Sequence, residues 1–168
     1  MRARNNGNAN FKLTISNLQG DIEEIKPRLN VHLFLLFGFS LGNKRLKSNP
    51  TDYDRVILCG PIWMGRFISP LKDFVVRYRK KIGELVFITC CGSSFKMKNE
   101  EFGHGLVFKK VQEITENCVH CEALPVTLVI PDDKKEDPQI VMNTRLSEAN
   151  FNGEILHLFN EFIKKVSA

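Results

Sequence analysis

Two apolar runs of strand length, each followed at once by a loop of small residues, constrain the fold of this chain more than any other feature. The first run, RVILCG over residues 55–60, ends at Gly60-Pro61, where a buried strand cannot continue. The second run, LVFITCC over residues 85–91, leads into Gly92-Ser93-Ser94. Continuous apolar runs are typical of strands that are buried on both faces. A helical pattern separates the two runs, and this alternation predicts an α/β fold with a largely parallel sheet.

Three helices are predicted from apolar residues that recur at helical spacing. The first begins near Phe67, with Ser69 as its expected N-cap and Pro70 tolerated in its first turn. The other two cover residues 106–114 and 151–166. Cationic side chains end the first helix where the helix dipole is negative, and for them a solvated helix end is favoured over a phosphate site. These side chains are Arg77, Arg79, Lys80 and Lys81.

Other segments give weaker patterns. The run ALPVTLVI over residues 123–130 predicts a further strand, in which Pro125 indicates a strand start or an edge position. Residues 20–26 alternate roughly as a strand would, and Pro27 ends them. Residues 10–18 fit either strand alternation or a helical face, and we assign them to a helix.

Length and composition limit the class of protein. The 168 residues predict a single domain over residues 1–168. The apolar share of 43% and the charged share of 26% exclude a disordered chain and a collagen-like chain. The formal charge of +5 is too small to indicate nucleic acid as a partner. Residues 131–146, which contain the run DDKKED, are predicted as a solvated loop with local structure around residues 140–142.

Cysteine usage and the longest apolar run indicate a cytoplasmic protein. The cysteine count is odd and residues 1–19 lack the apolar stretch of a secretory signal, so free thiols in a reducing compartment are expected. The run over residues 31–41 is shorter than the roughly 20 residues of a membrane-spanning helix, and no membrane span is expected. We interpret it as a buried helix or connection, with an exposed docking surface as the alternative. The cysteines are Cys59, Cys90, Cys91, Cys118 and Cys121.

Two segments at a fixed separation resemble the flavodoxin family. They are YDRVILCGPIWMG over residues 53–65 and, after the first predicted helix, VFITCCGSS over residues 86–94. The family commonly shows a Tyr-Asp pair, an apolar strand, a Pro-x-Trp-x-Gly segment and a later strand that ends in Thr-Cys-Gly-Gly or similar. The resemblance covers about residues 7–166. It implies a flavodoxin-like three-layer sandwich with five parallel strands in the order 2-1-3-4-5.

The resemblance also implies a cofactor site, in which FMN binds noncovalently at the carboxyl ends of the strands. Trp63, the single tryptophan, is the expected stacking residue, and backbone amides of the second loop would bond the edge of the flavin. The residues expected to flank the isoalloxazine are Pro61, Ile62, Trp63, Met64, Gly65, Cys91, Gly92, Ser93 and Ser94.

The start of the chain departs from the family pattern. In the family, a first strand precedes a phosphate-binding loop that is rich in Ser and Thr. Here Asn6, Gly7 and Asn8 are expected at the place of that loop. The positions where the family has Ser or Thr would be occupied by Arg4, Asn6 and Ala9. Only six residues precede Gly7, fewer than the loop and a strand of about 5 to 6 residues need. The first strand is therefore expected to be missing, with residues 1–6 disordered or rebuilt; a misassigned chain start is the alternative.

Taken together, the resemblance implies an FMN-binding redox protein in which no side chain need be catalytic. It would be an electron carrier or an FMN-dependent quinone or NAD(P)H oxidoreductase. Carriers of the family are typically acidic, and the charge of +5 makes a carrier that docks on basic partners less favoured. The expected partners are a redox protein or a small quinone or nicotinamide substrate. A homodimer is compatible with this function. The rival function is an interaction module without flavin, which would use residues 31–41 as its contact surface.

Three smaller features favour a structural interpretation. Cys118-x-x-Cys121 has redox or metal spacing, but a single pair is more typical of two buried thiols. Cys90 and Cys91 should point to opposite faces of a strand, one into the core and one toward the ligand crevice. His104, between two glycines, is interpreted as a surface loop histidine, with proton donation to a substrate as the alternative.

Overall fold

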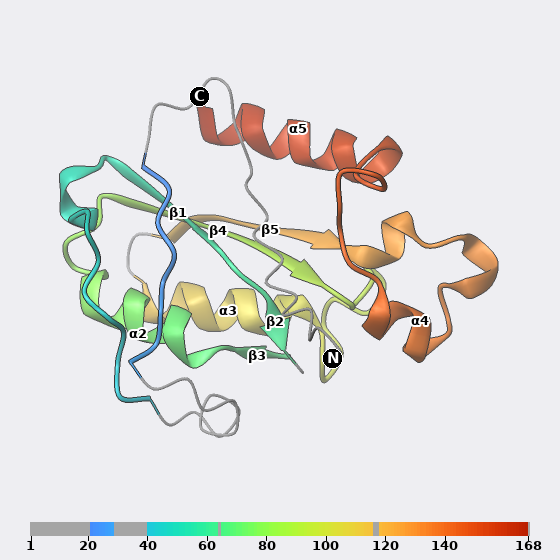
Figure 1. Ribbon diagram of the computed structural model, residues 1–168, viewed down its shortest axis with the longest axis horizontal. Coiled ribbons are helices and arrows are strands. Elements are labelled where there is room, and N and C mark those ends of the chain that lie inside the picture. Colours follow the sequence, from blue (N-terminus) through green and yellow to red (C-terminus); the bar gives the residue numbers. More distant parts are fainter. Residues whose placement is uncertain (1–20, 29–39, 64, 116–117, 168) are drawn as a thin grey trace, which may run out of the picture.

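The computed structural model describes residues 21–28, 40–63, 65–115 and 118–167, and its centre is a parallel sheet of three strands (Figure 1). The strands lie in the order β1-β4-β5. Their bounds are Arg55–Cys59 for β1, Glu84–Cys91 for β4 and Cys118–Pro125 for β5. The predicted α/β fold with a parallel sheet is therefore confirmed for the described part of the chain.

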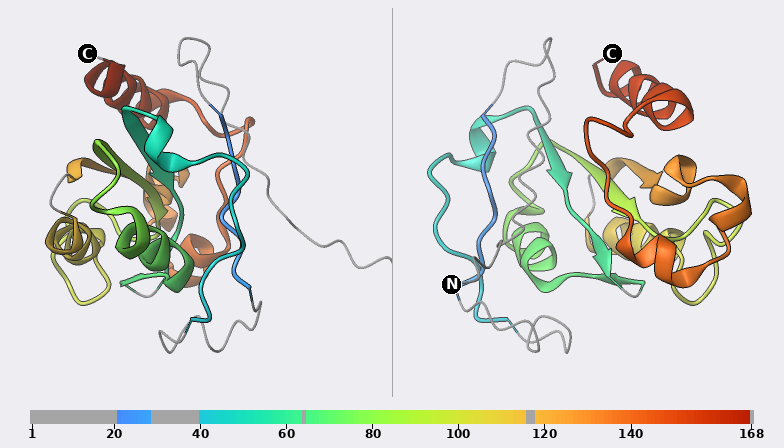
Figure 2. Two further views of the ribbon diagram at one scale, coloured as in Figure 1. Left: turned by 90° about the vertical axis from the view of Figure 1, so that its left-hand side faces the viewer. Right: turned by 45° about the vertical axis from the view of Figure 1, so that its right-hand side comes forward.

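Helices cover both faces of this sheet. Helices α2 (Ser69–Tyr78) and α3 (His104–Ile114) lie on one face, and α5 (Gly153–Ser167) lies on the other (Figures 1 and 2). Because α2 connects β1 to β4 and α3 connects β4 to β5, two successive β-α-β units build the sheet. The three predicted helices are all present.

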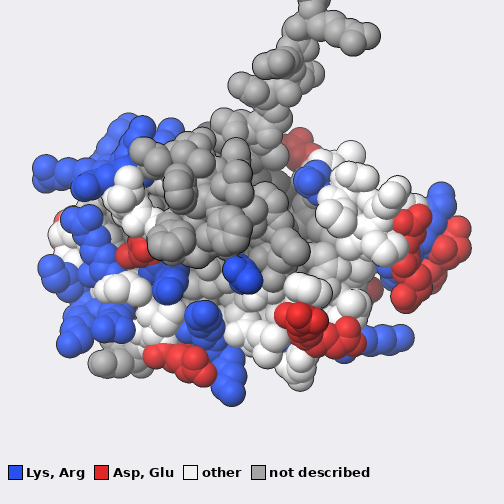
Figure 3. All heavy atoms as spheres, turned by 90° about the horizontal axis from the view of Figure 1, so that it is seen from below, with Lys and Arg blue, Asp and Glu red and all other residues white. Residues whose placement is uncertain are grey.

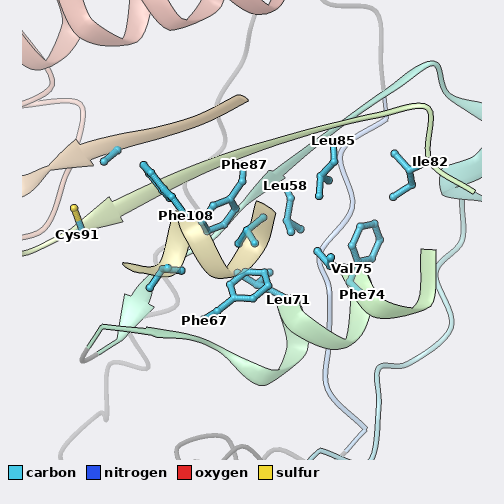
Figure 4. Close-up of a cluster of buried hydrophobic side chains, with 13 residues drawn as sticks. Leu58, Phe67, Leu71, Phe74, Val75, Ile82, Leu85, Phe87, Cys91 and Phe108 are labelled. Atoms are coloured by element: carbon cyan, nitrogen blue, oxygen red, sulfur yellow. The ribbon is translucent and has the colours of Figure 1, made fainter. Parts of the chain in front are cut away.

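Each face of the sheet has its own apolar core, and β4 contributes to both. On one face Phe87 packs in a cluster with side chains of α2 and α3 (Figure 4). On the other face Val86 and Ile88 pack against α5. Residues 85–89 are all buried, which explains why this strand has no polar alternation in its sequence. The α5 side chains in the second core are Ile155, Phe159, Phe162 and Val166.

The outer edge of β1 has no partner among the described strands. On the inner edge, the N–H of Glu84 donates to the Asp54 carbonyl and the N–H of Gly60 donates to the Ile88 carbonyl. Hydrogen bonds of a strand alternate between its two sides, so the backbone groups of residues 55, 57 and 59 point to the outer edge.

The strand predicted over residues 20–26 is not found, because residues 21–26 form no regular structure and only Pro27 makes an isolated bridge, to Asn43. Side chains hold this segment instead. Ile25 packs against the core on the α2 side, and the Glu23 carboxylate accepts the N–H groups of Lys47 and Ser48. The helix assigned to residues 10–18 and the expected disorder of residues 1–6 lie outside the described residues.

Two predicted boundaries are wrong. Strand β5 begins at Cys118 instead of residue 123 and ends at Pro125, after which Val126–Val129 form a 3-10 turn (η2). Ser69 is not the N-cap of α2, because the extended residue Ile68 takes that position and its carbonyl accepts the N–H groups of residues 71 and 72.

The remaining elements are short. Two 3-10 turns, η1 (Pro50–Asp52) and η3 (Asp132–Lys134), lie in connections, and helix α4 (Pro138–Asn143) confirms the local structure expected around residues 140–142. The Asp137 carboxylate caps α4 by accepting backbone N–H groups of its first turn. None of the helices in the described segments is both long enough and apolar enough to cross a membrane.

Candidate functional site

The two predicted ligand loops leave the sheet side by side. β1 and β4 are parallel neighbours, with Leu58 opposite Phe87 and Cys59 opposite Ile88. The loops that follow Cys59 and Cys91 therefore start at the same edge of the sheet, at its carboxyl end. In open α/β sheets this edge is where ligands bind.

The first loop folds as a small antiparallel hairpin of β2 (Ile62–Trp63) and β3 (Arg66–Phe67), which continues from the end of β1 (Figure 1). Ile62 is partly buried and packs against the core on the α2 side. Gly65 closes the turn with a φ of +64°, which glycine adopts without strain. Met64 and the Trp63 side chain lie outside the described parts, and the stacking role of Trp63 stays a prediction.

The second loop, residues 92–103, packs directly against the turn of this hairpin. A Cβ atom at Gly65 would lie 2.8 Å from the carbonyl oxygen of Glu101 and 2.8 Å from the Cα of Phe102. Only glycine permits this approach, so the hairpin and the second loop are tightly packed at this point. The structure thus brings together the two loops that the sequence singles out.

A buried cluster of Cys91, Ser93 and His104 holds the start of the second loop onto α3. His104, the first residue of α3, is 1% exposed, and its Nδ1 lies 2.9 Å from Ser93 Oγ and 3.6 Å from Cys91 Sγ. The Ser93 hydroxyl also accepts the backbone N–H of His104, and the Cys91 thiol donates to the Ser93 carbonyl. The Ser93 hydroxyl therefore contacts both the backbone N–H and the ring Nδ1 of His104.

This cluster corrects two predictions. His104 is not a surface loop histidine, because Phe95 and Phe108 pack around its ring. The Cys91 side chain is buried on the α3 side, so it does not face the ligand crevice; the exposed member of the adjacent pair is Cys90. The expectation that one of these two cysteines lies in the core is confirmed, and the expectation that the other faces a ligand crevice stays a prediction.

Burial keeps the cluster uncharged at neutral pH. It raises the pKa of the Cys91 thiol to about 11, against a smaller opposing effect from hydrogen bonds to Ser93. It also lowers the pKa of His104, and the nearby charge of Lys98 adds to this effect. A thiolate nucleophile and an imidazolium acid are therefore absent from this cluster, and its role is to position the loop.

The buried imidazole predicts how stability depends on pH. The pKa of His104 is lower in the folded protein than the value of about 6.5 in an unfolded chain, so the unfolded chain takes up a proton first. The contribution of His104 to the free energy of unfolding is fully present above about pH 6.5. It is lost as the pH falls from that value toward the pKa that His104 has in the folded protein. Denaturant unfolding at a series of pH values should show this loss, and His104→Asn should flatten it. The exposed His157→Asn should keep the parental slope; an unchanged slope in His104→Asn contradicts the assignment.

The surface around the loops is apolar and offers backbone amides. Gly92 is exposed and Ser94 is half-buried, while Phe95, Met97 and Phe102 expose large side chains within the second loop. The sequence interpretation missed these three residues, although apolar side chains in a loop between a strand and a helix were a usable signal. Such a surface suits a flat, partly polar ring system.

Other parts of the described chain are weaker candidates for a ligand or metal site. A cavity of about 90 Å³ lies between α2 and the segments around Ile25 and Asn43, far smaller than the roughly 300 Å³ of a typical ligand pocket. No group of three metal-ligating side chains occurs among the described residues. Cys121 is partly buried against the core, and Cys59, Cys90 and Cys91 are free thiols, as expected. Asn6, Gly7 and Asn8 lie outside the described residues.

No family model matches the sequence, and no curated protein and no solved structure shows significant similarity to it.

Proposed function

We propose that this protein is a flavodoxin-like FMN-binding redox protein, in which β1, β4 and β5 correspond to strands three to five of the order 2-1-3-4-5. The observation that carries the proposal is the meeting of the two loops. They leave the carboxyl ends of neighbouring parallel strands and touch through Gly65 and residues 101–102. The two segments with the most specific resemblance therefore lie next to each other in the fold, which supports the proposal.

The residues of this site fit a flavin. Gly92 is exposed and carries no side chain, so a ligand can approach its backbone closely from the solvent side. Amides of residues 92–94 would hydrogen bond to the polar edge of the ring, and Trp63 would stack on its face. Exposed Phe95 and Phe102 would exclude water from its apolar end.

When bound, FMN would supply the redox chemistry of the proposed protein. The chain would hold the ring in place and shield it, and the uncharged cluster of Cys91, Ser93 and His104 would fix the second loop. Phosphate contacts are assigned to Asn6, Gly7 and Asn8. The charge of +5 favours an oxidoreductase that acts on a small quinone or nicotinamide over an acidic electron carrier.

A Trp63→Ala variant tests the proposal. We expect the fluorescence of FMN to be quenched when the parent protein is added to it. The variant should bind FMN about fivefold more weakly, because one aromatic stacking contact contributes about 1 kcal/mol. Phe151→Ala serves as the matched aromatic control, since Phe151 packs against α5 on the other side of the sheet. A folded parent protein that leaves FMN fluorescence unchanged overturns the proposed function, and equal affinities refute only the stacking role.

The outer edge of β1 favours one second candidate, an interaction module that binds no flavin. No described strand pairs with that edge, and an open strand edge is a template for pairing with another chain. The two candidates differ in one result: the module would be folded and would not bind FMN.

A further inference from the structure

A basic face lies at the amino ends of the strands. Figure 3 shows Lys and Arg side chains gathered toward the side where α2 and residues 40–50 lie, while Asp and Glu gather toward the opposite side. We define the basic face by six exposed side chains from two distant segments: Lys44, Arg45, Lys47, Arg77, Lys80 and Lys81.

The fold brings these two segments together. Lys44 and Leu46 border the same small cavity as Arg77 and Tyr78, and the Asn43 side chain donates to the carbonyl of Pro70 in α2. Residues 43–47 therefore lie against α2. The sequence interpretation gave the cations at the end of α2 a dipole-compensating role, which does not account for the second segment.

The cations of this face form no ion pairs with the described carboxylates. None of the six forms an ion pair within the described residues. Two carboxylates lie nearby: Glu23 accepts backbone N–H groups of Lys47 and Ser48, and Asp73 accepts the Ser40 hydroxyl. The six cations outnumber these two carboxylates, so the face keeps an excess of positive charge that attracts an anionic partner.

We propose that the basic face binds the surface of an anionic lipid bilayer. The exposed side chains beside the cations are aliphatic, namely Leu41 at 68% exposure and Val76 at 47%. Cations with adjoining apolar side chains are the pattern of proteins that lie on membranes, whereas single-stranded nucleic acid is bound through exposed aromatic rings between the cations.

The orientation leaves the proposed cofactor site accessible. The arrows of the three strands point away from the basic face, toward the loops that follow β1 and β4 (Figure 1). A protein lying on the bilayer through α2 and residues 40–47 would expose those loops to solvent. The inference is independent of FMN binding.

Vesicle sedimentation tests the inference. The full chain should sediment with vesicles of phosphatidylcholine and phosphatidylserine, should stay in solution with phosphatidylcholine alone, and should be released by salt. The double variant Lys80→Ala/Lys81→Ala should partition at least tenfold less, because each cation near an anionic surface contributes about fivefold.

The matched control is Lys134→Ala/Lys135→Ala, which removes the same charge from η3 and the residue after it, on the side of the molecule away from α2 (Figure 1), and should partition like the parent. Thermal unfolding of both variants would establish that they fold. Equal loss in the two double variants shows that only net charge matters and overturns the inference. Binding to a fluorescent single-stranded oligonucleotide without vesicle binding overturns it in favour of nucleic acid.

Discussion

Replacing Phe87 with alanine is expected to lower the free energy of unfolding by about 3 to 5 kcal/mol, the usual cost of deleting a buried aromatic side chain. Phe87 is 0% exposed and lies in the middle of the central strand. Its ring makes edge-to-face contacts with Phe67 of β3, at 5.3 Å between centroids, and with Phe108 of α3, at 6.0 Å. It therefore links the hairpin of the first loop to the helix that follows the second (Figure 4).

Chemical denaturation of the parent protein and the variant measures this loss. The exposed Phe102→Ala is the matched control and should change stability by less than about 0.5 kcal/mol. A loss below about 1 kcal/mol in Phe87→Ala would mean that Phe87 does not organise the core as described.

Replacing Gly103 with alanine is also expected to lower the free energy of unfolding by a large amount. A Cβ atom at this position would lie closer to the carbonyl oxygens of Met97 and Lys98 than the 3.0 Å that real Cβ atoms keep. Both atoms belong to the backbone, so the loop itself must move. We expect a loss of about 3 kcal/mol, at the upper end of overpacking effects, together with lower FMN affinity because His104 follows directly.

The matched control for this change is Gly92→Ala in the same loop. Its added Cβ would meet only a Val141 side-chain methyl, at 3.2 Å, so the expected loss of stability is about 1 kcal/mol or less. Unfolding curves of the two variants give the comparison. If both alanine variants unfold at the same denaturant concentration, the close packing of residues 97–103 is not a constraint on the fold.

The elements that the sequence predicted well have strong periodic patterns. β4 is apolar throughout because it is buried on both faces, and α5 shows its inner face at helical spacing. The start of β5 was missed because residues 118–122, CVHCE, are neither apolar throughout nor at helical spacing. Val119 and Cys121 alternate with His120 and Glu122, a short strand signal, and pairing with β4 makes these residues a strand.

In the candidate site, too, some features were predicted from the sequence and others depend on tertiary contacts. The places of both loops follow from the ends of the apolar runs. Which cysteine faces inward depends on the register of β4 in the sheet, which the sequence does not reveal. The burial of His104 could not be predicted either, because its partners Cys91 and Ser93 are 13 and 11 residues away and meet it only through the fold of the second loop.

Amide chemical shifts in ¹⁵N-labelled protein during FMN titration test the central claim most directly, because they report where the flavin sits. The proposed site predicts shifts at Gly65, Gly92, Ser93 and Ser94, with little change at Arg55 and Glu84 at the opposite ends of the strands. An unchanged spectrum in excess FMN, or shifts confined to the basic face, would contradict it.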